Sequence, residues 1–290
     1  MSDVWDRSCA ARFFLVRCYY SLDELNARHA RRRSGRELRT QDSELPWNPM
    51  KCVILQPSYI PWRGYFHQIY KSDLFIFYDD VAFDKDGWRN RNRIKTASGV
   101  RWLTIPVTTE PGRQLHTTPI NLVRTCQQPE WKPVHWRTLQ HSYSKAPHFR
   151  RYAELLELFY QRESPLLCEY LIQLTMTIAA ELGIKRTRFR RSSEIGGTGT
   201  KTDRLINILT SVGATHYISG PAAKDYLNES KFRQAGISLE YMTYDYPEYE
   251  QLHPPFDPQV SVLDLLFMAG PDAPEYIWGS KSESVRRVGS

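Results

Sequence analysis

Residues 50–80 read MKCVILQPSYIPWRGYFHQIYKSDLFIFYDD, and this stretch decides the expected fold. Residues 52–55 form a short apolar strand that runs into a proline-rich loop, and residues 64–70 suit one or two helical turns. A second apolar and aromatic strand over residues 74–78 ends at Asp79-Asp80. Two strands joined by a helical crossover within about 30 residues are typical of a βαβ unit, which favours a parallel sheet.

The rest of the chain continues the α/β pattern. Residues 90–96 and 100–107 flank Ala97-Ser98-Gly99, which predicts a β-hairpin. Residues 129–183 are helical in pattern, with breaks near Pro147 and Pro165. The pattern then predicts a strand over 189–195, a helix over 202–212, strands over 217–219 and 239–243, and a helix over 261–268. We therefore expect an α/β fold with a mostly parallel, Rossmann-like sheet, a β-hairpin and a helical insertion over about 129–183.

Composition excludes several classes of protein. Of the 290 residues, 41% are hydrophobic and 24% are charged, which argues against a disordered chain. No apolar run approaches the roughly 18 residues of a membrane span, and no signal peptide is recognisable, so we expect a cytoplasmic protein. The net charge of +7 permits an acidic partner, but we do not expect nucleic acid as that partner. The unusual number is the 13% of aromatic residues, which include 8 Trp and 17 Tyr.

The first 49 residues differ from the rest, because they contain nine arginines and no lysine. An arginine cluster at residues 31–36 suits an arm that binds nucleic acid or a membrane surface. The simpler interpretation is a flexible or mis-annotated extension, because Met50 leads directly into the first strand. We expect residues 1–49 to be such an extension and residues 50–290 to form the α/β domain.

The five cysteines are odd in number and form no CxxC pair, so the sequence predicts neither a disulfide framework nor a zinc site. They are most simply packing residues of a protein in a reducing compartment. The histidines show no metal-ligand spacing either, and we expect no metal site.

The loop over residues 56–62 is a candidate binding site, because ligands of open α/β sheets lie outside the carboxyl ends of the strands. Two prolines stiffen the loop, which leaves Gln56, Tyr59 and Trp62 as amide, hydroxyl and stacking groups. The competing interpretation is a rigid turn with buried aromatic side chains.

Asp79 and Asp80 follow the second strand at the same predicted edge, and they are the candidate catalytic residues. A carboxylate there suits a general base, a metal ligand or an acceptor for a substrate hydroxyl. A helix cap or a structural ion pair explains the same residues without catalysis.

Residues 88–95 combine tryptophan, arginine and asparagine in the order WRNRNRIK. Strand alternation places Arg89, Arg91 and Arg93 on one face, where planar guanidinium groups suit phosphate or carboxylate. A solvated strand face is the alternative. The predicted substrate-binding residues of this segment are Trp88, Asn90, Arg91, Asn92 and Lys95.

Two later segments add candidates. The glycine-rich run at residues 196–200 leads through Lys201 into a helix, which suits either a phosphate site or a flexible loop. Tyr249 and Gln251 lie on one side of an extended segment and could close over a ligand. Ser261 and Asp264 have the spacing of a capping box, which favours a structural role for both.

Several long motifs resemble the WbqC-like protein family in the order in which that family has them. These motifs are ILQPSYIPWRGYF (54–66), YDDV (78–81), WRNRNRIK (88–95), WLTIPV (102–107), YISG (217–220) with YL (226–227), YEQ (249–251) and SVLDLLF (261–267). The resemblance runs from about residue 50 to residue 270. Leu55 stands where many members have His, Ala82 where a polar residue is common, and Met268 where Asn is frequent.

The resemblance implies a role in bacterial surface-polysaccharide or O-antigen synthesis, with transfer of an amino-acyl group such as glycine to a sugar. It also adds Ser219 and Tyr226 to the substrate-binding candidates. In this hypothesis Arg91 and Lys95 hold phosphate or carboxylate, and the small-molecule partner is a sugar nucleotide or an acyl donor. One alternative is a nucleotidyl-transferase-like enzyme with Lys201 at a triphosphate, and another is a non-catalytic binding protein. The sequence assigns no cofactor.

Overall fold

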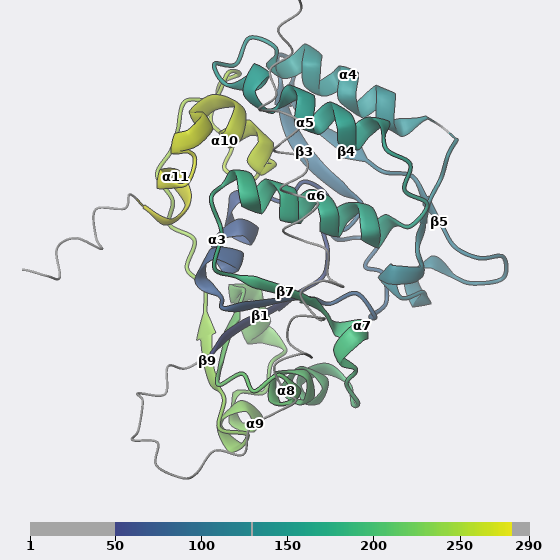
Figure 1. The fold of residues 1–290 in the computed structure, drawn as a ribbon, viewed down its shortest axis with the longest axis vertical. Helices are drawn as coiled ribbons and strands as arrows, with labels where there is room; N and C mark the ends of the chain where they lie inside the picture. Colours follow the sequence, from purple (N-terminus) through teal and green to yellow (C-terminus); the bar gives the residue numbers. More distant parts are fainter. Residues whose placement is uncertain (1–49, 129, 280–290) are drawn as a thin grey trace, which may run out of the picture. The chain divides into compact units, whose positions relative to one another are not determined.

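A parallel five-stranded sheet forms the centre of the computed structural model, which describes residues 50–128 and 130–279 (Figure 1). The strands run in the order β7-β2-β1-β8-β9, and every neighbouring pair is parallel. Their bounds are β1 (Lys51–Leu55), β2 (Leu74–Phe77), β7 (Arg188–Arg191), β8 (His216–Ser219) and β9 (Ser238–Tyr241). The predicted α/β class with a mostly parallel, Rossmann-like sheet is confirmed.

The order of the strands reverses beside β1. In chain order the sheet reads 3-2-1-4-5, because β2 pairs with one edge of β1 and β8 pairs with the other. Such a reversal leaves a crevice outside the carboxyl ends of the two central strands, where ligands of open α/β sheets bind. The residues that follow Leu55 and Ser219 therefore occupy the favoured position for a ligand site.

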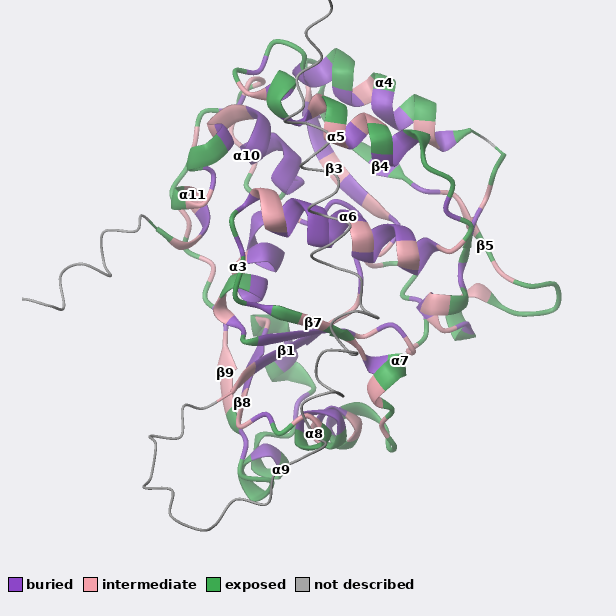
Figure 2. Ribbon diagram, viewed as in Figure 1, coloured by how far each residue is buried: buried purple, intermediate pink, exposed green. Residues whose placement is uncertain are grey.

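Helices cover both faces of the sheet (Figure 1). On one face lie α8 (Lys201–Ser211) and α9 (Glu229–Gln234), and Cys52 and Ile54 of β1 share an apolar core with Ile208 of α8. On the other face lie α3 (Arg63–Lys71) and α6 (Leu167–Glu181). Because both faces are covered, β1 and β2 are apolar almost throughout and buried (Figure 2).

The hairpin and the helical insertion are present as predicted. β3 (Arg91–Thr96) pairs with β4 (Gly99–Thr104) in antiparallel register, and Gly99 at the turn has a φ of 102° that favours glycine. The insertion consists of α4 (Trp131–Tyr143), α5 (Phe149–Gln161) and α6, with boundaries near the two predicted prolines. Short elements lie before it: β5 (Val107–Thr108), η1 (Leu115–Thr117), η2 (Ile120–Leu122) and β6 (Arg124–Thr125).

The chain after β8 is less regular. It contains η3 (Pro221–Asp225) before α9, and residues 242–260 have no helix or strand. α10 (Val262–Ala269), η4 (Gly270–Asp272) and α11 (Glu275–Trp278) follow. The long irregular segment passes the carboxyl edge of the sheet and supplies part of the site described below.

One predicted strand is wrong in its second half. β7 ends at Arg191, and α7 (Ser192–Ile195) replaces the strand that the sequence predicts up to residue 195. The reason lies outside the segment, because the carboxylate of Asp79 accepts hydrogen bonds from the backbone N–H of Ser193 at 2.9 Å and from its Oγ at 2.8 Å. A carboxylate at the start of a helix satisfies amides that the helix leaves free, and it stabilises the turn.

None of the helices within residues 50–128 and 130–279 is both long enough and apolar enough to cross a membrane. The predicted extension, residues 1–49, lies outside the described residues, so its assignment stays a prediction.

Candidate ligand-binding site

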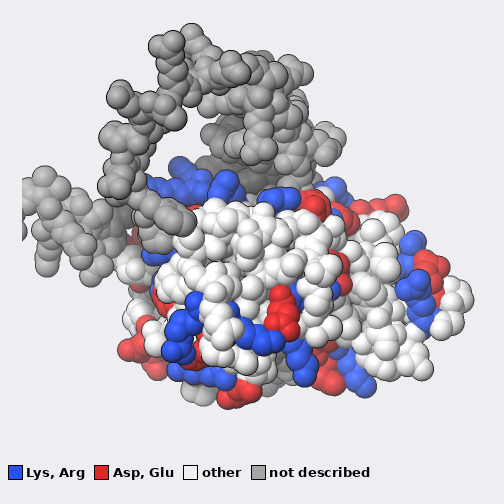
Figure 3. All heavy atoms as spheres, turned by 90° about the horizontal axis from the view of Figure 1, so that it is seen from below, with Lys and Arg blue, Asp and Glu red and all other residues white. Residues whose placement is uncertain are grey.

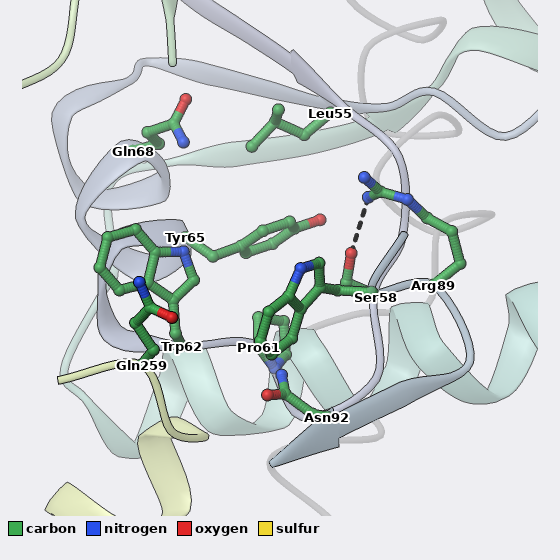
Figure 4. A pocket seen from close by; sticks show the side chains of 10 residues that line it. Leu55, Ser58, Pro61, Trp62, Tyr65, Gln68, Arg89, Asn92 and Gln259 are labelled. Carbon is green, nitrogen blue, oxygen red and sulfur yellow. Dashed lines mark hydrogen bonds between the residues drawn. The ribbon is translucent and has the colours of Figure 1, made fainter. Parts of the chain in front are cut away.

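A hollow of about 370 Å³ lies beside the carboxyl end of β1. We call it the crevice (Figure 4). It is lined by one residue of β1, the loop after it, α3, the start of the hairpin and the segment before α10: Leu55, Ser58, Pro61, Trp62, Tyr65, Gln68, Trp88, Arg89, Asn92 and Gln259. Its size and mixed lining are typical of small-molecule sites, which lie in the range of about 300–1,000 Å³.

The loop over residues 56–62 is held rigidly from the hairpin. Asn92 donates its Nδ2 protons to the carbonyls of Tyr59 at 3.0 Å and Ile60 at 2.9 Å. The loop needs this support, because Ile60 has a φ of 36° that is costly for a branched side chain. The amide of Val262 also donates to the carbonyl of Pro61 at 2.9 Å. The predicted binding residue Asn92 thus lines the crevice and also fixes its wall.

Trp62 and Trp88 give the crevice its aromatic walls. The Trp62 ring packs edge-on against Tyr244 at 4.8 Å between centroids and lies over Gly64, where a Cβ would come within 2.3 Å of the ring. Trp88 is 38% exposed and packs against Trp102. Both tryptophans were predicted from the sequence, and the structure brings them to the same crevice.

Two buried polar side chains complete the lining. Gln68 is 4% exposed, donates from Nε2 to the Tyr244 hydroxyl at 2.9 Å, and leaves Oε1 without a partner among the described residues. Tyr65 donates its hydroxyl proton to the carbonyl of Gln56 at 3.1 Å. Burial raises the pKa of Tyr65 above its ordinary value, so this phenol stays protonated at neutral pH. The lining is therefore rich in neutral hydrogen-bonding groups.

Three predicted residues lie at the same sheet edge without lining the crevice. Gln56 directly follows β1, and its side-chain Nε2 is 3.5 Å from the carbonyl of Ala82. Ser219 is buried at the end of β8, whereas Tyr226 is 66% exposed beyond it. Partial burial raises the pKa of Tyr226 above its ordinary value, although the charge of Arg89 acts in the opposite direction.

Asp79 and Asp80 lie at the carboxyl end of β2 with their oxygens already engaged. Asp79 is fully buried and holds the start of α7. Asp80 accepts from Ser192 Oγ at 2.5 Å and from Arg204 Nη2 at 2.6 Å. The helix-start and ion-pair explanations account for these contacts, and a catalytic role stays a prediction.

Three other predicted binding residues are bonded to backbone carbonyls. Asn90 donates to Ile105 at 2.8 Å, Arg91 donates to Asp86 at 2.8 Å, and Lys95 donates to Pro255. The Arg91 guanidinium also lies 5.1 Å from the centre of the Trp102 ring. None of the three lines the crevice.

Tyr249 and Gln251 belong to a buried group that we call the Asp264 cluster, formed by Lys95, Tyr143, Tyr249, Gln251 and Asp264. The Asp264 carboxylate accepts hydroxyl protons from Tyr143 and Tyr249, each at 2.8 Å. The predicted capping box is therefore wrong in one half: Ser261 Oγ caps α10 through the amide of Leu263, while the Asp264 carboxylate bonds to the two tyrosines. Burial raises the pKa of Asp264 despite these hydrogen bonds.

Tyr59 points into the protein rather than into the crevice. Its hydroxyl lies 2.9 Å from Nδ1 of His135 and 2.6 Å from the hydroxyl of Tyr160, inside an aromatic group that includes Trp131. Burial lowers the pKa of His135 to about 4. For this residue the interpretation as a buried aromatic of a rigid turn fits the contacts.

Lys201 is exposed at the first residue of α8 and has a φ of 51°. Figure 3 views the side of the molecule on which α8 and α9 lie, where basic and acidic side chains lie close together. Lys231 pairs there with Asp203 at 2.6 Å. Basic side chains of these helices are thus partly neutralised by neighbouring carboxylates.

The predicted binding residues do not include most of the lining: Leu55, Ser58, Pro61, Tyr65, Gln68, Arg89 and Gln259. A signal existed for Tyr65 and Gln68, which are three apart and share a face of α3 next to Trp62. For Arg89 the signal was the row of three alternating arginines. No sequence pattern indicates Gln259, because an irregular loop brings it to the site.

Within the described parts of the chain, no group of three or more His, Cys, Asp or Glu side chains has the arrangement of a metal site.

Comparison with known proteins assigns the family. The model of the WbqC-like protein family matches residues 56–276. The chain is 41% identical over 229 residues, which are 78% of this chain and 97% of the relative, to the uncharacterized protein Rv1507c of Mycobacterium tuberculosis. No solved structure matches the chain. The motifs quoted from residues 88–95 and 261–267 lie within the matched span, and the motif at 54–66 overlaps it from residue 56 onward. The chain belongs to the WbqC-like protein family.

Proposed function

We propose that this protein is a transferase that binds a sugar-containing ligand, such as a sugar nucleotide, in the crevice and modifies it by acyl or amino-acyl transfer. The observation that carries the proposal is the lining itself: two tryptophan walls around a buried glutamine amide whose Oε1 has no partner in the described residues. Sugars present an apolar ring face and many hydroxyls, so aromatic walls and amide groups suit them. A role in surface-polysaccharide synthesis and a cytoplasmic location belong to the same proposal.

Asp80 is the preferred residue for activating the acceptor amine or hydroxyl. It lies at the same sheet edge as the crevice and is partly exposed, whereas Asp79 is fully buried. Arg204 pairs with Asp80 at 2.6 Å and holds this carboxylate at the sheet edge. Loss of surface polysaccharide in a strain whose only copy is Asp80→Asn, at normal protein levels, supports this role. Normal polysaccharide in that strain contradicts it.

The binding step is tested with UDP-glucose, UDP-N-acetylglucosamine and dTDP-glucose in isothermal titration calorimetry. Trp62→Ala removes one wall, and we expect at least tenfold weaker binding of the sugar nucleotide that binds the wild type. Trp278→Ala is the matched control, because Trp278 stacks on Tyr70 and does not line the crevice. Equal losses in both variants, or no binding of any of the three compounds, contradict the proposal.

One observation supports a nucleotidyl-transferase-like activity as the second candidate. The glycine-rich segment and Lys201 lie at the start of α8, and Arg204 of the same helix reaches Asp80 at the carboxyl edge of the sheet. The free amides of a helix start suit phosphate. Binding of ATP or CTP that Lys201→Ala abolishes and Trp62→Ala leaves unchanged favours this candidate over sugar binding in the crevice.

A further inference from the structure

Arg89 is the only charged side chain among the ten described residues that line the crevice. Its guanidinium forms part of the wall beside Ser58 (Figure 4). Nη1 donates to Ser58 Oγ at 2.8 Å and to the carbonyl of Gln56 at 3.3 Å, and both acceptors are neutral. Nε has no hydrogen-bond partner among the described residues, and none of their carboxylates lies within 4.0 Å of the guanidinium. The guanidinium is thus partly buried and forms no direct ion pair with a described residue.

Other arginines with restricted exposure are treated differently in this protein. Arg191 holds Glu169 through both of its terminal nitrogens, and Arg204 pairs with Asp80 at 2.6 Å. Arg63, which is 4% exposed, donates to two carbonyls and is surrounded by three aromatic rings. Compared with these three, Arg89 forms neither an ion pair with a carboxylate nor a contact with an aromatic ring face in the part of the chain that the structure describes.

Among the described residues, no carboxylate forms a direct ion pair with Arg89. The charge of Asp84 acts on Arg89 from a distance, while Asp84 Oδ1 accepts hydrogen bonds from the amides of Asp86 and Gly87 in its own turn. Tyr65 and Tyr226 are phenols whose pKa values are raised by burial, so they are uncharged at neutral pH. Burial lowers the pKa of Arg89 itself, which reflects the cost of an unpaired buried cation.

We propose that Arg89 binds an anionic group, phosphate or carboxylate, of the ligand that the crevice takes. The inference rests on the proposed function and adds a selective feature to it, since the ligand must place an anion beside Ser58 and Gln56. Nε and Nη2 form the edge of a guanidinium that receives two oxygens side by side, and Nη2 makes no hydrogen bond with a described residue. Arg91 and Lys95, the cations predicted for this role, are bonded to carbonyls outside the crevice.

The test compares the wild type with Arg89→Gln and Arg89→Lys. The probes that carry an anionic group are UDP-glucose, UDP, inorganic phosphate and glycine, which is a zwitterion with a carboxylate, and the probe without such a group is glucose. We expect Arg89→Gln to weaken binding of the anionic probe about 100-fold and binding of glucose less than threefold. Arg89→Lys keeps the charge but loses the planar fork, so about tenfold weakening is expected. Loss of UDP or phosphate binding identifies a phosphate as the anion, whereas loss of glycine binding alone identifies a carboxylate.

A second measurement does not depend on a folded variant. The Nε–H signal of Arg89 in the ¹H–¹⁵N spectrum of the wild type should shift saturably with the anionic probes and not with glucose. The absence of a shift with all four probes that carry an anionic group overturns the inference. Binding of UDP-glucose that depends on Trp62 but not on Arg89 overturns the inference and leaves the proposed function standing. A shift of the Arg89 signal with phosphate or glycine, in a protein that binds no sugar nucleotide, supports the inference and contradicts the proposed function.

Discussion

The crevice and the Asp264 cluster are both rich in polar side chains, but they differ in how those side chains are satisfied. In the Asp264 cluster, both tyrosine hydroxyls reach the carboxylate, and Gln251 exchanges hydrogen bonds with the backbone of Asp257 at 3.0 and 2.8 Å. In the crevice, Gln68 Oε1 and Arg89 Nε have no partner among the described residues. A closed set of polar contacts stabilises a fold, whereas unsatisfied polar atoms in side chains that line a hollow are groups that a ligand can satisfy.

The largest expected effect comes from breaking the closed cluster. Asp264→Ala leaves the hydroxyls of Tyr143 and Tyr249 buried without an acceptor and opens a small cavity. We expect the free energy of unfolding to fall by about 3–5 kcal/mol. Urea denaturation followed by circular dichroism measures it. A loss below about 1 kcal/mol would show that the cluster is not a closed structural unit.

The next effect is a pH dependence that originates away from the crevice. Burial lowers the pKa of His135 to about 4, so the folded protein keeps this ring neutral where the unfolded chain, with a pKa near 6.5, binds a proton. The stabilisation is complete above about pH 6.5 and is lost as the pH falls from there towards 4. Between pH 7 and pH 5 we expect a loss of about 2 kcal/mol.

The control for this pH dependence is His135→Asn, which retains a polar group near the Tyr59 hydroxyl. The variant is expected to be less stable at pH 7 but to lose about 2 kcal/mol less than the wild type between pH 7 and pH 5. Urea denaturation at both pH values gives the difference. Equal losses in the two proteins contradict a neutral buried His135.

The smallest effect separates the two regions with a matched pair of substitutions. Gln68→Met and Gln251→Met remove an amide of the same size from the crevice and from the Asp264 cluster. We expect Gln68→Met to change stability by less than about 1 kcal/mol and to weaken binding of UDP-glucose about tenfold, which is about 1.4 kcal/mol. Gln251→Met should lower stability by about 1–2 kcal/mol and leave the affinity of the folded protein unchanged. If Gln68→Met lowered stability and Gln251→Met weakened binding instead, the Asp264 cluster rather than the crevice would be the binding region.

The sheet was predictable because its signals are local. The apolar runs of β1 and β2, the proline-rich loop and the turn at Gly99 each encode their own structure within a few residues. The end of β7 was not predictable from its local sequence. Asp79, more than a hundred residues earlier in the chain, supplies the acceptor that stabilises the start of α7. Local pattern cannot report a partner that only the fold brings close.

The sequence predicted the location of the site, at the carboxyl end of the first strand, better than it predicted which residues line the site. Strand alternation correctly separates the buried Asn92 and Ile94 from Arg91 and Arg93. Arg89 is the arginine of the row whose Nε has no partner among the described residues. This difference depends on the turn before the strand, which the sequence pattern does not predict. Tyrosine is a common residue type in binding sites, but the hydroxyl of Tyr249 donates its proton to Asp264.

The most direct test of the central claim is a crystal structure of the protein with UDP-glucose or, if it binds more tightly, another sugar nucleotide of the panel. The account predicts a ligand in the crevice, with its sugar against Trp62 or Trp88, a hydrogen bond to Gln68 Oε1 and an anionic group on Arg89. A ligand seated instead at Lys201, or an empty crevice in crystals grown at a concentration that saturates the protein in solution, would contradict it.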